Sequence, residues 1–258
     1  MMNIFEQHLT LKKKIRAGQP TLGLFIRTPA PQIVESLAQT GLDFVALDAE
    51  HAPFGINALD ICILAARASG IPVLVRVPEA TSSKVLSVLD MGAAGIIVPH
   101  VKTAGEALES VAASRYVGGT RGFSGAHRAA AYGAMPADTF KKKSDASTIV
   151  IGQIEDADGV KNIDEIAAVS TLDAVFIGRA DLSNSLGAAT PDDPAVDRAV
   201  DGICKASLQA ERTIGMYLST TDDVKKFRAK GVSLFIISTD QGLLVKAART
   251  VAEDFKGV

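Results

Sequence analysis

The chain has 258 residues, of which 47% are hydrophobic and 22% charged, and its formal net charge is −2. This composition allows a sizeable core and excludes a disordered chain. It also argues against nucleic acid as the main partner, because nucleic-acid binding needs a basic surface. The two cysteines, Cys62 and Cys204, have no C-x-x-C or Cys/His ligand spacing, so neither a disulfide scaffold nor a zinc site is expected.

The N-terminal stretch 1–18 contains no apolar segment of the kind found in signal peptides. No later apolar run approaches the ~18 residues that a membrane span requires. We therefore expect a cytoplasmic protein with no membrane partner. The short basic runs at 12–14 and 141–143 are interpreted as the solvent-facing sides of helices.

In chain order, the sequence predicts eight short apolar strands separated by helices. The strands are expected at 21–27, 43–51, 71–78, 94–100, 148–156, 172–182, 212–219 and 232–240. Helical periodicity is clear at 31–41 and 56–70, and four helix-like stretches end in a glycine suited to a C-cap, namely Gly41, Gly70, Gly92 and Gly231. Near-continuous apolar strands covered by helices indicate a parallel sheet buried on both faces.

Eight strands alternating with about eight helices predict a (β/α)8 TIM barrel that forms a single domain over residues 1–258. An open doubly wound sheet is the alternative, weakened because no G-x-G-x-x-G follows the first strand. The glycine-rich segment 115–136 is too long for a plain connector. It is either a functional loop or a mobile surface excursion.

Active sites of such barrels form at the C-terminal ends of the strands. The polar residues expected at those ends are Asp48, Glu50, His51, Arg76, His100, Gln153, Glu155, Asp156, Arg179, Asp181 and Asp240. We expect these side chains to converge on one mouth of the barrel.

Two apolar runs that are neighbours in the predicted barrel end in an acid, Glu155 and Asp181. Facing carboxylates repel each other unless positive charge lies between them, so a divalent cation bound by oxygen ligands is one interpretation. The other is helix N-capping, because aspartates begin the turns that follow both runs.

The run DAEH at 48–51 places Asp48 near His51, and such a pair can orient an imidazole for proton transfer. A purely structural histidine is the alternative. Arg76 lies within an apolar strand, where a guanidinium needs either a protein carboxylate or a substrate anion. A lysine imine mechanism is disfavoured, because no predicted strand contains lysine and the nearest is Lys102.

Five motifs occur in order along the chain: LDAEHAP, VRVPE, VLDMGAAGIIVPHV, QIEDADGVKNIDEIAAV and FIGRADLSNSLG. Together they resemble the HpcH/HpaI aldolase family, which comprises metal-dependent class II pyruvate aldolases related to citrate lyase β-subunits. The resemblance covers about residues 20–245. It implies a (β/α)8 barrel that exchanges its C-terminal helix between subunits and forms a homo-oligomer, commonly a hexamer built as a trimer of dimers.

The resemblance also implies roles for individual residues. Glu155 and Asp181 match the ligands of Mg²⁺ or Mn²⁺, with Co²⁺ as a further option. His51 matches the catalytic base, and Asp90 matches the carboxylate that raises its basicity, although Asp48 is an alternative for that role.

The remaining family positions concern the substrate. Arg76 matches the residue that stabilises the enolate, while Gln153 and the backbone around Ala180 match positions that hold the pyruvate unit. The implied reaction cleaves 4-hydroxy-2-oxoacids to pyruvate and an aldehyde, and also runs in reverse. Two alternatives remain open. One is another enolate-forming lyase, such as a citramalyl-CoA-type lyase or a decarboxylase relative, and the other is a non-catalytic ligand-binding barrel.

The chain departs from the family pattern at three places. Arg179 replaces a proline, and could attract an anionic group or pair on the surface. His100 replaces the methionine of the common V-P-M-V run. The loop at 115–136 lacks the usual prolines but carries three basic or imidazole side chains that suggest an acidic acceptor aldehyde, namely Arg121, His127 and Arg128.

Overall fold

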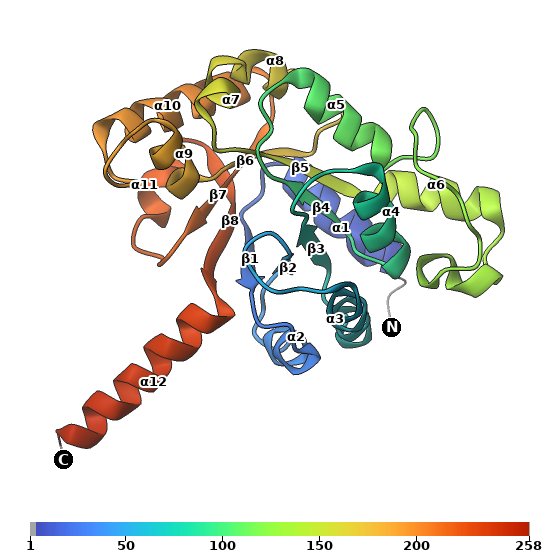
Figure 1. Cartoon of the computed structure of the whole chain (residues 1–258), viewed down its shortest axis with the longest axis horizontal. Helices are drawn as coiled ribbons and strands as arrows, with labels where there is room; N and C mark the ends of the chain where they lie inside the picture. Colours follow the sequence, from blue (N-terminus) through green and yellow to red (C-terminus); the bar gives the residue numbers. More distant parts are fainter. Residues whose placement is uncertain (1–3, 258) are drawn as a thin grey trace.

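Eight parallel strands close into a barrel in the computed structural model, which describes residues 4–257 (Figure 1). The strands follow one another around the barrel in sequence order, and β8 pairs with β1. The predicted (β/α)8 barrel is confirmed. The strands are β1 (Thr21–Ile26), β2 (Phe44–Asp48), β3 (Val73–Arg76), β4 (Gly95–Val98), β5 (Ile149–Ile154), β6 (Ala174–Ile177), β7 (Thr213–Leu218) and β8 (Val232–Thr239).

Helices surround the barrel on its outer side, as Figure 1 shows. Gly70 and Gly92 follow two of these helices, with φ of 74° and 107°, and cap them as expected. Gly41 also has a positive φ, but α2 ends at Leu37, so its prediction as a cap was wrong. The helices are α1 (Ile4–Arg16), α2 (Pro31–Leu37), α3 (Ile56–Ser69), α4 (Ser82–Met91), α5 (Ala104–Ala113), the 3₁₀ turn η1 (Arg128–Gly133), α6 (Ala137–Ser147), α7 (Ala157–Lys161), α8 (Ile163–Ala167), α9 (Arg179–Ser185), α10 (Pro194–Gln209), α11 (Val224–Ala229) and α12 (Asp240–Lys256).

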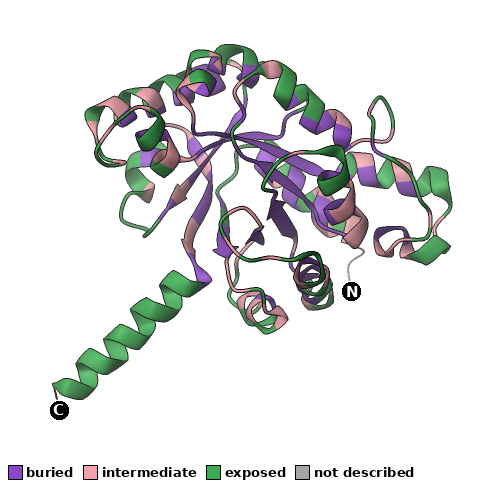
Figure 2. Cartoon of the chain, viewed as in Figure 1, coloured by how far each residue is buried: buried purple, intermediate pink, exposed green. Residues whose placement is uncertain are grey.

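The strands are buried on both faces, which explains their near-continuous apolar sequences (Figure 2). One apolar cluster fills the barrel and includes Phe25, Phe44 and Phe176. A second, larger cluster lies between the strands and the helices. Large and small residues alternate inside the barrel: a Cβ atom on Gly215 would lie 2.5 Å from the ring of Phe176, so that position must be glycine.

Helix α1 contacts the segments just before β5 and β6 and the first residue of β7, and therefore covers the end of the barrel opposite the predicted site. Its Lys12 amine donates to the carbonyl of Thr148 at 2.7 Å and lies 3.5 Å from Asp173. Lys12 is thus buried, and the expectation that the whole run 12–14 faces solvent was wrong. The hydroxyl of Thr213 donates to the carbonyl of Ile15 at 2.6 Å.

Helix α12 extends away from the barrel instead of packing on it (Figures 1 and 2). Only its first residue, Asp240, is buried, and it holds the end of β1 by accepting backbone N–H bonds from Arg27 and Thr28. Cys62 and Cys204 are buried and free, as expected. Within residues 4–257, no helix combines the length and apolar character needed to cross a bilayer.

Candidate active site

Asp48 and Arg76 form a buried ion pair at the C-terminal ends of β2 and β3. Barrel register places the two residues side by side, and Nε and Nη2 of Arg76 donate to Oδ1 of Asp48 at 3.0 and 2.8 Å. Arg27 donates to the other carboxylate oxygen at 2.8 Å. Burial alone would raise the pKa of Asp48, but these two guanidinium groups and a backbone hydrogen bond lower it below its usual value. Asp48 therefore holds a fixed negative charge beneath the site.

Glu50 connects this ion pair to two histidines. Its carboxylate lies 3.2 Å from Nε of Arg76, 3.6 Å from Nε2 of His51 and 3.5 Å from Nε2 of His100. Burial raises the pKa of Glu50, and the charges of Arg76 and His100 partly offset that effect. Glu50 is thus a central member of the site.

His51 is the accessible imidazole of the site, with 45% of its side chain exposed. Its backbone N–H donates to Asp48 at 3.1 Å, which fixes the start of the loop after β2. Its Nε2 atom lies 4.0 Å from the carboxylate of Asp181. The imidazole can therefore exchange protons with a bound molecule, while Asp48 fixes its backbone and Glu50 lies beside the ring.

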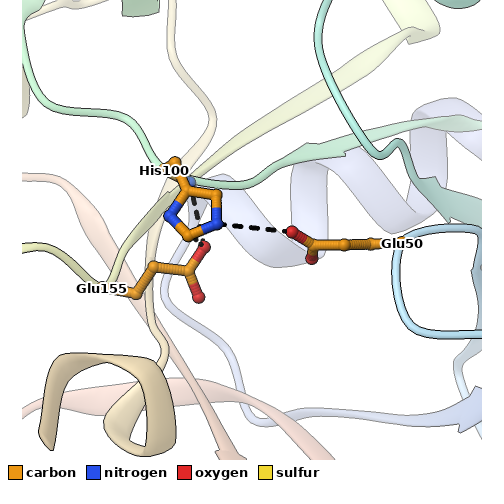
Figure 3. A group of neighbouring side chains, drawn as sticks. All are labelled: Glu50, His100 and Glu155. Atoms are coloured by element: carbon orange, nitrogen blue, oxygen red, sulfur yellow. Dashed lines mark hydrogen bonds and ion pairs between the residues drawn. The ribbon is translucent and has the colours of Figure 1, made fainter. Parts of the chain in front are cut away.

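Glu155 directly follows β5, and its carboxylate is buried, with a side-chain exposure of 1%. One oxygen accepts the backbone N–H of His100 at 2.9 Å, and the other accepts an N–H from the side-chain amide of Gln153. The imidazole of His100 lies 3.6 Å from Glu155 and faces Glu50 on its other side, as Figure 3 shows. Burial raises the pKa of Glu155 despite these donors.

His100 is held in an unusual backbone conformation just beyond β4. Its φ of 54° is left-handed, which costs a non-glycine residue about 1–2 kcal/mol. Its Nδ1 atom lies 2.9 Å from a carboxylate oxygen of Asp156. Burial lowers the pKa of His100, but the hydrogen bond with Asp156 and the charges of Glu155, Asp156 and Glu50 outweigh this effect and raise it.

Gln153 and Gly178 shape the space around Glu155. Gln153 is buried, and its Oε1 atom accepts no hydrogen bond from residues 4–257. A Cβ atom on Gly178 would lie 2.6 Å from Oε2 of Glu155 and 3.0 Å from the amide nitrogen of Gln153. Glycine at position 178 therefore lets the chain after β6 pass directly over the buried carboxylate.

Asp181 was expected at the end of a strand, and that placement was wrong. Strand β6 ends at Ile177, and Asp181 lies in the first turn of α9 together with Ala180. The carboxylate of Asp181 is 41% exposed and faces His51. The backbone carbonyl of Ala180 accepts the hydroxyl of Ser183 at 2.6 Å.

Asp90 lies on α4 and is separate from His51 within one chain. Its carboxylate accepts a hydrogen bond from Arg121 at 2.7 Å and lies 3.4 Å from Nε2 of His127. Among residues 4–257, the carboxylates beside His51 are Asp48, Glu50 and Asp181. Asp48 contacts the backbone of His51, Glu50 and Asp181 lie near its imidazole, and Asp90 is bonded elsewhere.

The other unusual basic residues are paired within the protein. Arg179 donates to the carbonyl of Pro191 and to Asp192, each at 2.6 Å, so it follows the surface-pairing alternative. Arg128 forms two hydrogen bonds with Asp60, at 2.7 and 2.8 Å. Since Arg121 is also bonded to an acid, these contacts do not support the hypothesis of an acidic acceptor.

The buried Glu155 carboxylate fits a cation site. Its two direct donors are neutral N–H groups, and its ion-pair partner among residues 4–257 is the imidazole of His100, 3.6 Å away, which is charged only when protonated. A buried carboxylate with no permanent cation beside it is unfavourable. One ligand atom from each of Glu50, His100 and Glu155 lies within 4.8 Å of the other two, so the oxygen and nitrogen donors that a divalent cation prefers are already gathered.

Comparison with known proteins identifies the scaffold. A sequence profile described as HpcH/HpaI aldolase/citrate lyase matches residues 21–247, which is most of the chain. The chain belongs to this family. It is therefore an aldolase-type lyase, as the sequence motifs implied.

Family members with assigned activities match over nearly their whole length. A 5-keto-4-deoxy-D-glucarate aldolase of Klebsiella pneumoniae is 32% identical, with coverage of 95% of this chain and 96% of the relative. A hydroxypyruvate/pyruvate aldolase of Deinococcus radiodurans is 33% identical, covering 96% and 90%. The crystal structure of a HpcH/HpaI aldolase/citrate lyase family protein from Burkholderia cenocepacia superposes with a TM-score of 0.91 at 30% identity, covering 96% and 99% of the two chains.

Within this HpcH/HpaI site, sequence reasoning placed Glu50 and His100 at the mouth but assigned neither a role. The signal for Glu50 was present, because it stands between Asp48 and His51 in the DAEH run. His100 could be noticed only as an unusual residue in VPHV. Its contact with Glu50 joins the ends of β2 and β4, which are not neighbours in the barrel.

Proposed function

We propose that the chain is a divalent-cation-dependent pyruvate aldolase that cleaves 4-hydroxy-2-oxoacids to pyruvate and an aldehyde, and catalyses the reverse addition. The observation that carries the proposal is the gathering of a buried carboxylate, Glu155, a buried guanidinium, Arg76, and an accessible imidazole, His51, at one end of the barrel. The names of the relatives from Klebsiella and Deinococcus support this reaction class.

The cation we propose is Mg²⁺ or Mn²⁺, with Co²⁺ as a further option, and Glu155 and Asp181 are its proposed carboxylate ligands. When bound, such a cation acts as a Lewis acid toward the oxygens of a 2-oxoacid. Glu155 is supported by its burial and its lack of a lysine or arginine partner among residues 4–257. Asp181 is supported by its exposure toward His51.

Arg76 is the group we propose to stabilise the enolate. Its Nε and Nη2 atoms are occupied by Asp48, while Nη1 makes no hydrogen bond to any residue in the described range 4–257. Its guanidinium also stacks over the ring of Phe25, with 4.6 Å between Cζ and the ring centroid. A guanidinium fixed on one edge presents its other edge to a developing negative charge without reorganising.

His51 is the proposed base. It takes the proton of the C4 hydroxyl as the C3–C4 bond breaks, the electrons of that bond form the enolate of pyruvate, and the aldehyde leaves. Protonation of C3 then completes pyruvate. Asp48 and Glu50 are the carboxylates we propose to position His51, since both contact it.

Gln153 and the backbone near Ala180 are proposed to hold the pyruvate unit. Gln153 offers a buried Oε1 atom with no partner among residues 4–257, beside Glu155. Asp90 is bonded to Arg121 and does not contact His51 of its own chain within residues 4–257. We propose that, if Asp90 raises the basicity of a histidine as the resemblance implies, that histidine is the His51 of another copy.

We propose that two copies of the chain exchange helix α12. The helix exposes five large apolar residues, namely Leu243, Leu244, Val245, Val251 and Phe255. A groove of about 820 Å³ lies over β1 and β8 beside α11, lined by Leu22, Phe235, Ile237 and residues of α11. This is the place that an eighth barrel helix would cover, and α12 of the same chain leaves it open. A trimer of such dimers would be a hexamer.

The deciding experiment measures pyruvate release from 4-hydroxy-2-oxopentanoate, coupled to lactate dehydrogenase, with Mn²⁺ or Mg²⁺. Activity should disappear in EDTA and return when the cation is added. Glu155→Gln should lose both Mn²⁺ binding and turnover, whereas His51→Gln should retain Mn²⁺ and lose about 10²–10⁴ in turnover. Activity that survives complete chelation, or covalent trapping of pyruvate by borohydride, would refute the proposal.

A further inference from the structure

We propose that His100 is a nitrogen ligand of the cation, completing with Glu50 and Glu155 a mixed nitrogen–oxygen site. The inference rests on the proposed cation-dependent function and deepens it, because it assigns ligands beyond Glu155 and Asp181.

The first argument is distance. Nε2 of His100 lies 3.5 Å from Oε1 of Glu50, and one donor atom from each of His100, Glu50 and Glu155 lies within 4.8 Å of the other two. Neighbouring ligands of a divalent ion with bonds of about 2.1 Å stand about 3 Å apart. The three groups therefore need only small side-chain rotations to share one ion.

The second argument is the orientation of the imidazole. Nδ1 of His100 lies 2.9 Å from a carboxylate oxygen of Asp156, so it is the nitrogen that carries hydrogen toward that acid. In the neutral imidazole, which is the form that binds a metal, Nε2 is then the nitrogen with a free lone pair, and it faces Glu50 (Figure 3). A histidine that binds a metal commonly donates its other N–H to a carboxylate in this way.

The third argument is the cost of the conformation. His100 has a left-handed backbone, its N–H donates to Glu155, and Nδ1 is the ring nitrogen near that carboxylate, at 3.6 Å. A strained residue of this kind persists only where the surrounding structure fixes it, and such residues cluster at functional sites. Beside it, the Oε1 atom of Gln153 is buried without a hydrogen-bond partner among residues 4–257.

The ligand set has a consequence for metal choice. Imidazole suits Co²⁺, Ni²⁺ and Zn²⁺, and Mg²⁺ prefers oxygen ligands alone. The chain should therefore bind Co²⁺ and Mn²⁺ much more tightly than Mg²⁺. Replacement of His100 by methionine should reduce that preference by about tenfold or more, while Mg²⁺ affinity changes little.

The test is pulsed EPR of the full-length protein loaded with Mn²⁺, which detects a directly bound ¹⁴N nucleus, together with calorimetric titration of Co²⁺ and Mg²⁺. A ¹⁴N coupling should be present in the parent chain and in His51→Gln, but absent in His100→Met. Asp156→Asn should retain the coupling and weaken Co²⁺ binding by about 10–100-fold, because it only orients the imidazole.

Three outcomes overturn the inference in distinguishable ways. If Mn²⁺ binds through Glu155 and supports pyruvate release but shows no ¹⁴N coupling, His100 is not a ligand and the proposed function stands. If no divalent ion binds and activity resists EDTA, both the inference and the proposed function fail. A coupling that disappears in His51→Gln instead would assign the nitrogen to His51 and also overturn the inference.

Discussion

Gly178→Ala tests the geometry around Glu155 with a single added methyl group. Gly178 has a φ of −96° and a ψ of 84°, so it does not use the left-handed region that favours glycine. The new Cβ atom would lie 2.6 Å from Oε2 of Glu155 and 3.0 Å from the amide nitrogen of Gln153. Ordinary van der Waals contact begins near 3.4 Å, so the carboxylate must move by about 0.8 Å.

That movement has a calculable effect on the site. Glu155 is held by the N–H groups of His100 and Gln153, and a shift of this size breaks one of these bonds. A hydrogen bond to a charged group contributes about 1.5–3 kcal/mol. At 1.4 kcal/mol per factor of ten, we expect Mn²⁺ affinity to fall by about 10–100-fold.

The assay is the EPR signal of free Mn²⁺ during titration, followed by pyruvate release at saturating Mn²⁺. Gly202→Ala is the matched control, because no atom lies within 4 Å of the Cβ that it adds. It lies within α10 and should leave Mn²⁺ affinity unchanged while stabilising the fold by up to about 1 kcal/mol. A folded Gly178→Ala protein with the parent's Mn²⁺ affinity would show that Glu155 is not a ligand.

Three further predictions concern stability and assembly. Asp48→Asn should lower the free energy of unfolding by about 3–5 kcal/mol, because it removes the buried negative charge between two guanidinium groups. Urea unfolding measures this change, and a loss below about 1 kcal/mol would contradict the prediction. Burial lowers the pKa of His8 from 6.5 to about 4, so as pH falls the unfolded chain binds a proton before the folded chain does. The free energy of unfolding should therefore fall by about 3 kcal/mol between pH 6.5 and pH 4. His8→Gln should remove this pH dependence in urea unfolding, and parallel pH curves for the parent and the variant would refute the prediction. The double variant Leu244→Glu with Val251→Glu should be monomeric by light scattering, because both side chains belong to the exposed apolar residues of α12. The control Lys246→Glu on the same helix should keep the parent's mass. An unchanged mass for the double variant would exclude α12 as the contact between subunits.

The eight strands could be predicted because a parallel strand buried on both faces must be apolar throughout, and such runs are visible in the sequence. The ends of the strands were less predictable. The run at 172–182 continues apolar to Ile177, but α9 begins already at Arg179, which places Asp181 in a helix. The chain turns at Gly178, where a side chain would collide with the carboxylate of Glu155. The sequence alone does not reveal that these two residues lie so close.

The candidate site was predictable where a side chain ends a strand or directly follows it. Asp48, Arg76 and Glu155 lie at the rim for this reason. The links between elements were not predictable, because they depend on how the closed barrel brings non-adjacent strands together. The contact between Glu50 and His100, and the pairing of Asp90 with Arg121, are both of this kind.

The net charge at the mouth of the barrel gives the cation a second role, in the binding of an anionic substrate. Within residues 4–257, the ion pairs around Glu50, His51 and Glu155 join five carboxylates and three lysine or arginine side chains, which leaves two negative charges when the histidines are neutral. The acids are Asp48, Glu50, Glu155, Asp156 and Asp181, and the bases are Arg27, Arg76 and Lys102. A 2-oxoacid about 6 Å away would meet a repulsion of about 5 kcal/mol at an effective dielectric constant of 20.

A divalent ion cancels this excess, so an anionic substrate should bind only after the cation does. Calorimetry should therefore detect pyruvate binding with Mn²⁺ and none in EDTA. Asp156→Asn removes one negative charge without removing a proposed ligand, and should make cation-free pyruvate binding measurable at low ionic strength. Equal pyruvate affinity with and without Mn²⁺ would mean that Arg76 alone captures the carboxylate and that the surplus acids are neutralised in some other way.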